Sequence, residues 1–183
     1  MWWTSIIIDL KKFDKIYVQA DEIVKRLDKI GLQNTENIKN FRDFDSSIIE
    51  VFRKKITSIN YSSKKEIKLV FFAFNRKEKG LSDLAYAVNN FNKTNSCTKY
   101  KVDIYGPVEK KYNKEFFSLI EEISELEYKG ILTDQTEIYK VLNSYDLMAF
   151  PSYYQGEGFP TVIVEAFISG LPVLASRWKY NEE

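Results

Sequence analysis

The sequence predicts an α/β protein whose core is a doubly wound parallel sheet. From residue 66 onward, short apolar runs alternate with stretches in which apolar residues recur at helical spacing. There are five such apolar runs, and one helical stretch joins each run to the next. Because a right-handed crossover through a helix makes neighbouring strands parallel, this alternation favours a parallel sheet with helices on both faces.

The individual elements of this sheet follow from local patterns. The segment before Gly106 and Pro107 is apolar and stops at that pair, as a strand does at a turn. Pro160 is expected at the first position of the last helix, because its fixed φ and missing N–H suit that position. Gly170 is expected to end the same helix. The expected strands are 67–74, 100–105, 126–132, 146–150 and 171–175, and the expected helices are 81–91, 110–123, 135–142 and 160–169.

A smaller unit is expected before the sheet. It has a strand at 15–20, a helix at 22–30 that Asp21 caps and Gly31 ends, and a short strand at 35–39. Residues 6–10 are apolar and either end a helix or form a strand. The organisation expected is a unit at residues 1–44, a linker at residues 45–65 with a short helix near 48–52, and a domain at residues 66–183.

Composition narrows the class of protein. The 183 residues are 44% hydrophobic and 29% charged, as in ordinary globular proteins, and the net charge of +1 gives no electrostatic case for binding nucleic acid or an anionic membrane. No run approaches the ~20 apolar residues of a membrane span, and the first residues do not resemble a signal peptide. The absence of histidine removes the commonest general base and metal ligand. Cys97 is the single cysteine, which excludes an internal disulfide and suits a reducing compartment.

The last helix carries one acid among apolar residues. From 162 to 168 every side chain except Glu165 is apolar, so the helix is expected to be buried nearly all round and the acid to need a partner. Seven residues separate it from Glu157, which lies in a Gly-flanked loop at the helix N-terminus. The free N–H groups and dipole of such a terminus suit a phosphate, and a buried acid suits ribose hydroxyls. The alternative is that Glu165 pairs with a Lys or Arg of the chain and Glu157 is an ordinary loop acid.

These residues resemble the Glu-x7-Glu signature of retaining GT-B glycosyltransferases of family four, the glycosyl transferases group 1. The resemblance covers about residue 15 to the end and is strongest over 67–176. It implies a Rossmann-like doubly wound sheet that forms the C-terminal, donor-binding half of a GT-B fold, truncated at its C-terminus and preceded by a remnant of the N-terminal, acceptor domain. The matching segments, in the order of the signature, are Pro151–Ser152, Glu157–Gly158–Phe159, Glu165–Ala166 and Gly170–Leu171–Pro172–Val173.

The resemblance implies transfer of a sugar from a UDP- or GDP-linked donor to an acceptor hydroxyl with retention, in polysaccharide or glycoconjugate synthesis. The implied partners are an acceptor glycan or lipid-linked sugar and a complementing N-terminal half. The implied location is the cytoplasm, with a peripheral place at the inner membrane face as a further option. No metal or other cofactor is expected, because Lys, Arg and the helix dipole can neutralise the leaving diphosphate.

Family roles carry over to particular residues. Lys79, followed by Gly80, matches the Lys that holds the leaving diphosphate. The family's Arg falls on Phe74 and is therefore missing, and Arg76 is expected to substitute for it. Glu157 is expected to contact the donor sugar, which makes Glu157, Lys79 and Arg76 the catalytic candidates. The alternative for 75–80 is a solvated Lys/Glu turn.

The expected binding residues are Glu165 for the ribose, the helix N-terminus for the diphosphate, and two strand ends. Gly106 permits close backbone approach to the ligand or only ends a strand. Ile131 lies where the family's backbone contacts the base. Tyr153 and Tyr154 either stack on the ligand or pack the loop down. The complete set of expected binding residues is Glu165, Gly158, Phe159, Pro160, Gly106 and Ile131.

Two other classes of protein are alternatives. A non-catalytic or degenerate nucleotide-sugar-binding remnant or partner subunit is favoured by Phe74 in place of Arg and by the missing acceptor domain. An unrelated nucleotide-binding protein needs Gly-x-Gly-x-x-Gly after a first strand or a Walker loop, and the sequence contains neither.

Overall fold

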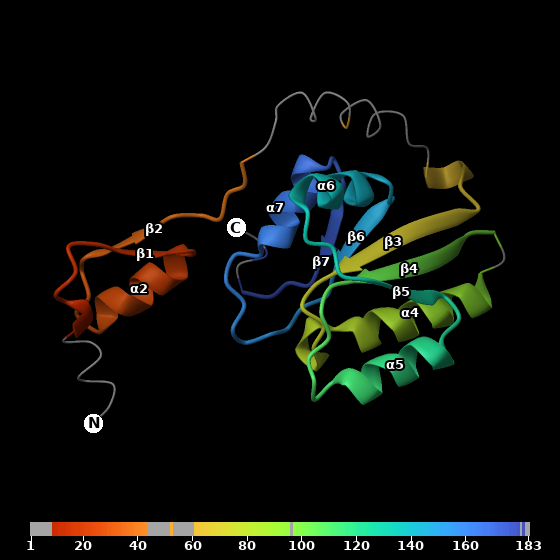
Figure 1. Ribbon diagram of the computed structural model, residues 1–183, viewed down its shortest axis with the longest axis horizontal. Coiled ribbons are helices and arrows are strands. Elements are labelled where there is room, and N and C mark those ends of the chain that lie inside the picture. The colour runs from red at the N-terminus through yellow and green to blue at the C-terminus, as the bar shows by residue number, and fades with distance from the viewer. Residues whose placement is uncertain (1–8, 44–51, 53–60, 96, 180, 182–183) are drawn as a thin grey trace.

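The computed structural model describes residues 9–43, 52, 61–95, 97–179 and 181. A small N-terminal unit and a larger sheet domain are joined by the chain that follows the unit (Figure 1). Of the expected linker, residues 45–51 and 53–60 lie outside the described residues, and with them all of the expected helix near 48–52 except Phe52. No helix within the described ranges is long and apolar enough to cross a membrane.

The N-terminal unit consists of β1 (Ile16–Val18), α2 (Asp21–Lys29) and β2 (Thr35–Asn37), with β1 parallel to β2. Gly31 follows α2 with φ of +83°, so the expected end of this helix is confirmed. The expectation that Asp21 caps α2 is wrong. Ala20 is the N-cap, and the Asp21 carboxylate instead accepts a hydrogen bond from Asn37 Nδ2 at 2.8 Å.

The sheet domain contains the five expected strands in the order β5-β4-β3-β6-β7, all parallel. The predicted α/β fold class is therefore confirmed. The strands are β3 (Glu66–Phe72), β4 (Lys99–Tyr105), β5 (Leu126–Gly130), β6 (Leu147–Phe150) and β7 (Val173–Ala175). The helices between them are α4 (Leu81–Thr94), α5 (Asn113–Glu122), α6 (Gln135–Asn143) and α7 (Thr161–Ile168), with short 3₁₀ turns at Tyr61–Ser63 and Lys77–Lys79.

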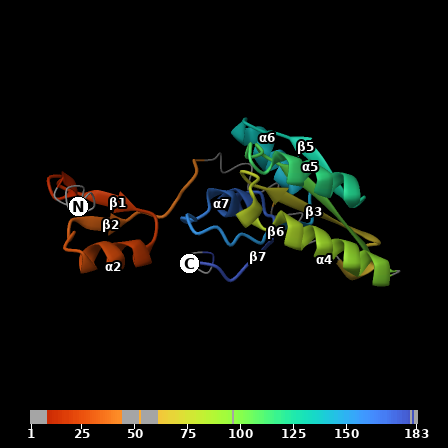
Figure 2. The ribbon, with the colours of Figure 1, turned by 90° about the horizontal axis from the view of Figure 1, so that it is seen from below.

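Helices cover both faces of the sheet, with α6 and α7 above it and α4 and α5 below it in Figure 1. The central strand β3 supplies both cores because successive side chains of a strand point to opposite faces. Leu69 and Phe71 belong to the core between the sheet and helices α4 and α5, whereas Val70 belongs to the core between the sheet and helices α6 and α7. The view in Figure 2 shows α7 on the side of the sheet domain that is nearest to the N-terminal unit.

The helix α7 differs in two respects from the expectation. Pro160 is the N-cap, with ψ of 117°, and the first helical residue is Thr161. The helix is also not buried all round, since Phe167 is 63% exposed. Glu165 lies on the buried side, and Gly170 ends the helix with φ of +65°, as expected.

Candidate functional site

A cleft of about 500 Å³ lies at the carboxyl ends of the strands. The carboxyl ends of parallel strands are where ligands of doubly wound sheets bind. The four loops that follow β3, β4, β5 and β6 all contribute to its lining, as does the first turn of α7. The loop after β3 supplies Phe74 and Lys79, the loop after β4 supplies Gly106, and the loop after β5 supplies Leu132. The loop after β6 and the first turn of α7 supply residues 157–162. Gln19 and Asn40 line the cleft from the N-terminal unit and the segment that follows it.

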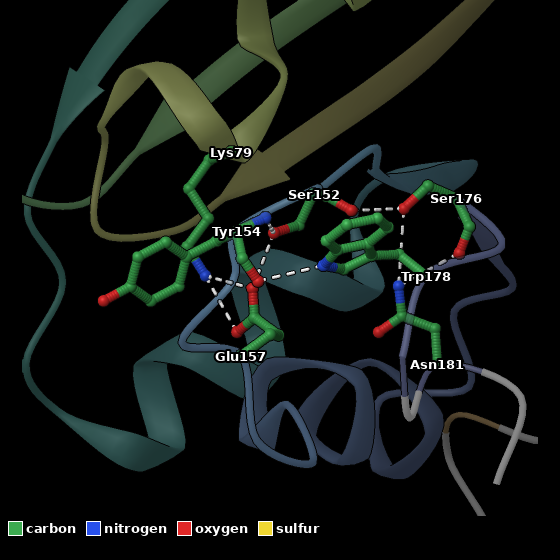
Figure 3. Close-up of polar contacts among 7 residues, drawn as sticks. All are labelled: Lys79, Ser152, Tyr154, Glu157, Ser176, Trp178 and Asn181. Atoms are coloured by element: carbon green, nitrogen blue, oxygen red, sulfur yellow. Dashed lines mark hydrogen bonds and ion pairs between the residues drawn. The ribbon is translucent and has the colours of Figure 1, made fainter.

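Lys79 and Glu157 meet at this cleft although they are 78 positions apart. Lys79 Nζ lies 2.9 and 2.6 Å from the two carboxylate oxygens of Glu157, and both side chains are largely buried. Ser152 Oγ donates to Glu157 Oε2 at 2.6 Å (Figure 3). The pair forms because β3 and β6 are neighbours in the sheet, so their loops emerge side by side.

The loop that carries Glu157 is held by the segment after β7 (Figure 3). Trp178 Nε1 donates to the Tyr154 carbonyl oxygen at 2.9 Å, and Ser176 Oγ donates to the Ser152 carbonyl oxygen. Asn181 Nδ2 in turn donates to the Ser176 carbonyl oxygen at 3.0 Å. These contacts fix the backbone on both sides of Tyr154, and the position of Glu157 depends on that backbone.

The N-terminus of α7 opens on the cleft, because Thr161 and Val162 of its first turn line it. The expected residues Gly158, Phe159 and Pro160 line it as well. A helix N-terminus directs N–H groups and the positive end of its dipole outward, which favours an anion.

Glu165 is buried one turn further along α7 and accepts a hydrogen bond from Arg42 Nε at 2.8 Å. Its carboxylate therefore has the protein cation that the alternative interpretation expected. The open cleft beside Gly158 is present too, so the ion pair and the cleft coexist. Tyr139 lies beside this pair, and burial raises the pKa of its hydroxyl, with a further contribution from the charge of Glu165.

Arg76 does not line the cleft. Its guanidinium lies between two aromatic rings, 4.9 Å from the centroid of Phe74 and 4.6 Å from that of Tyr154. Its Nη2 is 3.7 Å from Glu109 Oε1, and its Nε is buried with no hydrogen-bond partner in the part of the chain that the structure describes. Phe74, in contrast, is half-exposed and lines the cleft.

The remaining expected residues have clear positions. Gly106 lines the cleft with φ of +108°, and a Cβ there would lie 1.9 Å from the Ala73 carbonyl oxygen, so the close approach it permits is that of the loop after β3. Ile131 is exposed, and its neighbour Leu132 is the residue that lines the cleft. Tyr153 donates to the Lys77 carbonyl oxygen at 3.2 Å, which packs the loop down.

Sequence reasoning missed the residues that reach this site from the N-terminal side. Gln19 Nε2 donates to Asn40 Oδ1 at 2.6 Å, and Asn40 Nδ2 donates to the Phe159 carbonyl oxygen. Arg42 and Trp178 were missed too. Asn40 and Arg42 belong to the segment that follows β2, residues 38–43, which we call the connector. The pairing of Asn40 with a carbonyl oxygen 119 positions away leaves no local pattern, so no signal in the sequence indicated this contact.

The fold and the cleft define a Rossmann-like α/β domain with an open cleft at the carboxyl ends of its strands. The chain belongs to the family described as glycosyl transferases group 1, whose model matches residues 52–183. No curated protein matches the chain.

Solved structures of GT-B glycosyltransferases have the same fold. TarM of S. aureus, in complex with fondaparinux, alpha-GlcNAc-glycerol and UDP, superposes with a TM-score of 0.70 at 21% identity over 97% of this chain and 33% of its own. HepE of Anabaena, with UDP and glucose, gives a TM-score of 0.70 at 19% identity over 96% and 48%. The pneumococcal O-GlcNAc transferase GtfA, with UDP and GlcNAc, gives 0.67 at 19% identity over 98% and 33%. The chain thus spans a third to about half of the length of these proteins.

Proposed function

We propose that this chain is the donor-binding half of a glycosyltransferase that uses a nucleotide-diphosphate sugar. The observation that carries the proposal is the cleft, because it combines a cation, Lys79, with the N-terminus of α7 at the strand ends. The family match supports the same class of donor. The structures of TarM, HepE and GtfA contain UDP, which favours a uridine nucleotide as the first ligand to test.

The proposed chemistry divides between the two ends of the donor. Negative charge builds on the diphosphate as the sugar leaves, and Lys79 with the α7 N–H groups would stabilise it electrostatically. Glu157 would accept hydrogen bonds from the sugar, and Glu165 from the ribose. Arg76 would have to leave its place between Phe74 and Tyr154 to add its charge.

Further proposals concern the reaction that the whole glycosyltransferase would catalyse. The sugar would be transferred with retention, through an oxocarbenium-like transition state, to the hydroxyl of a glycan or lipid-linked acceptor. No divalent ion would be needed for donor binding. A complementing N-terminal half would supply the acceptor site, and the reaction would serve polysaccharide or glycoconjugate synthesis in the cytoplasm or at the inner membrane face.

Calorimetry with UDP and GDP, each with and without EDTA, tests donor binding. We expect one of the two nucleotides to bind equally well in both buffers and Glu165→Ala to weaken its binding about tenfold, the effect of one lost charge-assisted hydrogen bond. Glu121→Ala is the matched control, because Glu121 is an exposed acid of α5 on the opposite face. If neither UDP nor GDP gives a heat of binding, the proposed function is excluded.

A second candidate is a non-catalytic nucleotide-sugar-binding subunit. Two observations favour it, namely Phe74 at the position of the family's Arg and Arg76 outside the cleft. An assay of sugar transfer with a complementing N-terminal half separates the candidates. Donor binding without transfer or donor hydrolysis would favour the binding subunit, whereas turnover that Lys79→Met abolishes would favour the enzyme.

A further inference from the structure

The connector contacts α7 at two points. Asn40 Nδ2 donates to the carbonyl oxygen of Phe159, just before the helix, and Arg42 Nε donates to Glu165 Oε1 at 2.8 Å in its second turn. The two contacts join parts of the chain that are 119 and 123 positions apart. The connector therefore determines the surroundings of the acid that the donor site is proposed to use.

The burial of the Arg42 and Glu165 side chains shows which of the two needs the other as a polar partner. The Glu165 side chain is 8% exposed and that of Arg42 is 32% exposed. A carboxylate buried to this extent is costly without a charged or hydrogen-bonding partner, whereas a guanidinium that reaches solvent is not. Arg42 thus supplies the polar partner that the buried Glu165 side chain needs, and the contact restricts the rotamers of Glu165.

Glu165 does not itself line the cleft, but it lies one turn from residues of α7 that do. It follows Thr161 by four positions and Val162 by three, so all three lie on one side of α7, and both residues of the first turn line the cleft. Side chains of a helix lean towards its N-terminus, which here is the end that opens on the cleft. Arg42 engages Oε1 in the described structure, and a carboxylate has about four acceptor sites, so it can still accept hydrogen bonds from a diol.

We infer that Arg42 is a positioning residue that orients Glu165 towards the ribose hydroxyls of the bound nucleotide. This rests on the proposed function and adds a residue from outside the sheet domain to its donor site. If Arg42 only attached the connector to α7, its loss would affect all parts of the nucleotide alike. A positioning role predicts a selective effect. Loss of Arg42 should weaken recognition of the ribose hydroxyls more than recognition of the diphosphate.

The experiment compares the affinity of the full chain for UDP and for 2′-deoxy-UDP, or for the guanosine pair if GDP is the nucleotide that binds. We expect the unaltered chain to prefer the ribonucleotide about tenfold, since the lost hydroxyl bonds to a charged group. Arg42→Gln should reduce this preference to about twofold. Arg42→Lys, which retains the charge, should restore part of it. Lys39→Gln removes an exposed cation from the same connector and should leave the preference unchanged.

Thermal unfolding of each variant separates recognition from folding, and Arg42→Lys carries the comparison if Arg42→Gln fails to fold. A ribonucleotide preference that is unchanged in the Arg42 variants overturns the inference, even if overall affinity or stability falls, and leaves the proposed function intact. No preference in the unaltered chain overturns it as well. Binding of neither UDP nor GDP by the unaltered chain overturns the proposed function, and this inference with it.

Discussion

Lys79 Nζ contacts both carboxylate oxygens of Glu157, at 2.9 and 2.6 Å, inside the cleft proposed for the donor. The two side chains are 12% and 10% exposed, so each largely compensates the charge of the other. A diphosphate that enters the cleft must share Lys79 with Glu157. The pair therefore connects the stability of the domain with the affinity of the site.

Lys79→Met should affect both properties. Because Glu157 would remain as a buried charge without its cation, we expect the free energy of unfolding to fall by about 3 kcal/mol, the lower end of the range for a buried pair, since both side chains retain some exposure. Nucleotide affinity should fall at least about tenfold, because a charge-assisted contact to the diphosphate is lost. Urea denaturation and calorimetry measure the two effects.

The double variant Lys79→Met with Glu157→Gln is the control for this prediction. It removes the stranded charge while keeping an acceptor for Ser152, so it should regain about 1–2 kcal/mol of stability without regaining affinity. Equal stability of the single and double variants would show that the two charges are not coupled.

Gly106 should be intolerant of any side chain. A Cβ there would lie 1.9 Å from the Ala73 carbonyl oxygen, and φ is +108°. We expect Gly106→Ala to cost more than about 3 kcal/mol of stability, because the floor of the cleft must shift. Gly130→Ala is the matched control, since its φ is +91° with nothing within 4 Å of the added Cβ, and it should cost only about 1–2 kcal/mol of backbone strain. Equal losses in thermal unfolding would contradict the close approach at Gly106.

Tyr145 should contribute to an alkaline loss of stability. Burial, followed by hydrogen bonds with Tyr105 and Asp103, raises the pKa of its hydroxyl well above the ordinary value of 10. The unfolded chain loses this proton near pH 10 while the folded chain keeps it, so the stabilisation is present below pH 10 and is lost as the pH rises above it. One proton corresponds to a slope of about 1.4 kcal/mol per pH unit in the free energy of unfolding. Between about pH 10 and 11.5, the free energy of unfolding of Tyr145→Phe should therefore decline less steeply than that of the unaltered chain, by up to this amount per pH unit.

Urea denaturation at each pH provides the measurement for the Tyr145 prediction. Near neutral pH, Tyr145→Phe should cost about 1–2 kcal/mol, because the hydroxyl donates to Asp103 Oδ2 at 2.8 Å. Tyr86→Phe, at an exposed tyrosine of α4, is the control and should follow the unaltered chain. Parallel stability curves for Tyr145→Phe and the unaltered chain would contradict the assignment.

The fold was predictable because its determinants are local. The apolar run of β3 and the glycine after α7 each define an element within a few residues of its true bounds. The meeting of Lys79 with Glu157 was within reach of the same reasoning, since loops at the carboxyl ends of neighbouring parallel strands converge.

The features that the sequence did not predict depend on contacts between distant segments. Asp21 has the composition of an N-cap, but Asn37 on the neighbouring strand binds its carboxylate and Ala20 takes the cap position. The sequence required a partner for Glu165 without identifying one, because Arg42 precedes it by 123 positions. Burial of Phe167 was inferred from hydropathy alone, which does not distinguish a helix that is covered on all sides from one with an exposed apolar side chain.

Trp178 should control the order of the loop that carries Glu157. Its indole N–H donates to the Tyr154 carbonyl oxygen at 2.9 Å, and the Tyr154 ring lies 5.5 Å from Lys79 Nζ. Trp178→Phe keeps an aromatic ring but removes this donor, so we expect a loss of about 1 kcal/mol in stability and faster hydrogen exchange at residues 152–158. Nucleotide affinity should fall about three- to fivefold, because binding must then order a looser loop. Tyr153→Phe, which removes a longer hydrogen bond of 3.2 Å from a half-exposed ring on the same loop, should change affinity less than about twofold. If exchange at the loop and affinity are both unchanged in Trp178→Phe, the segment after β7 does not hold the Glu157 loop in place.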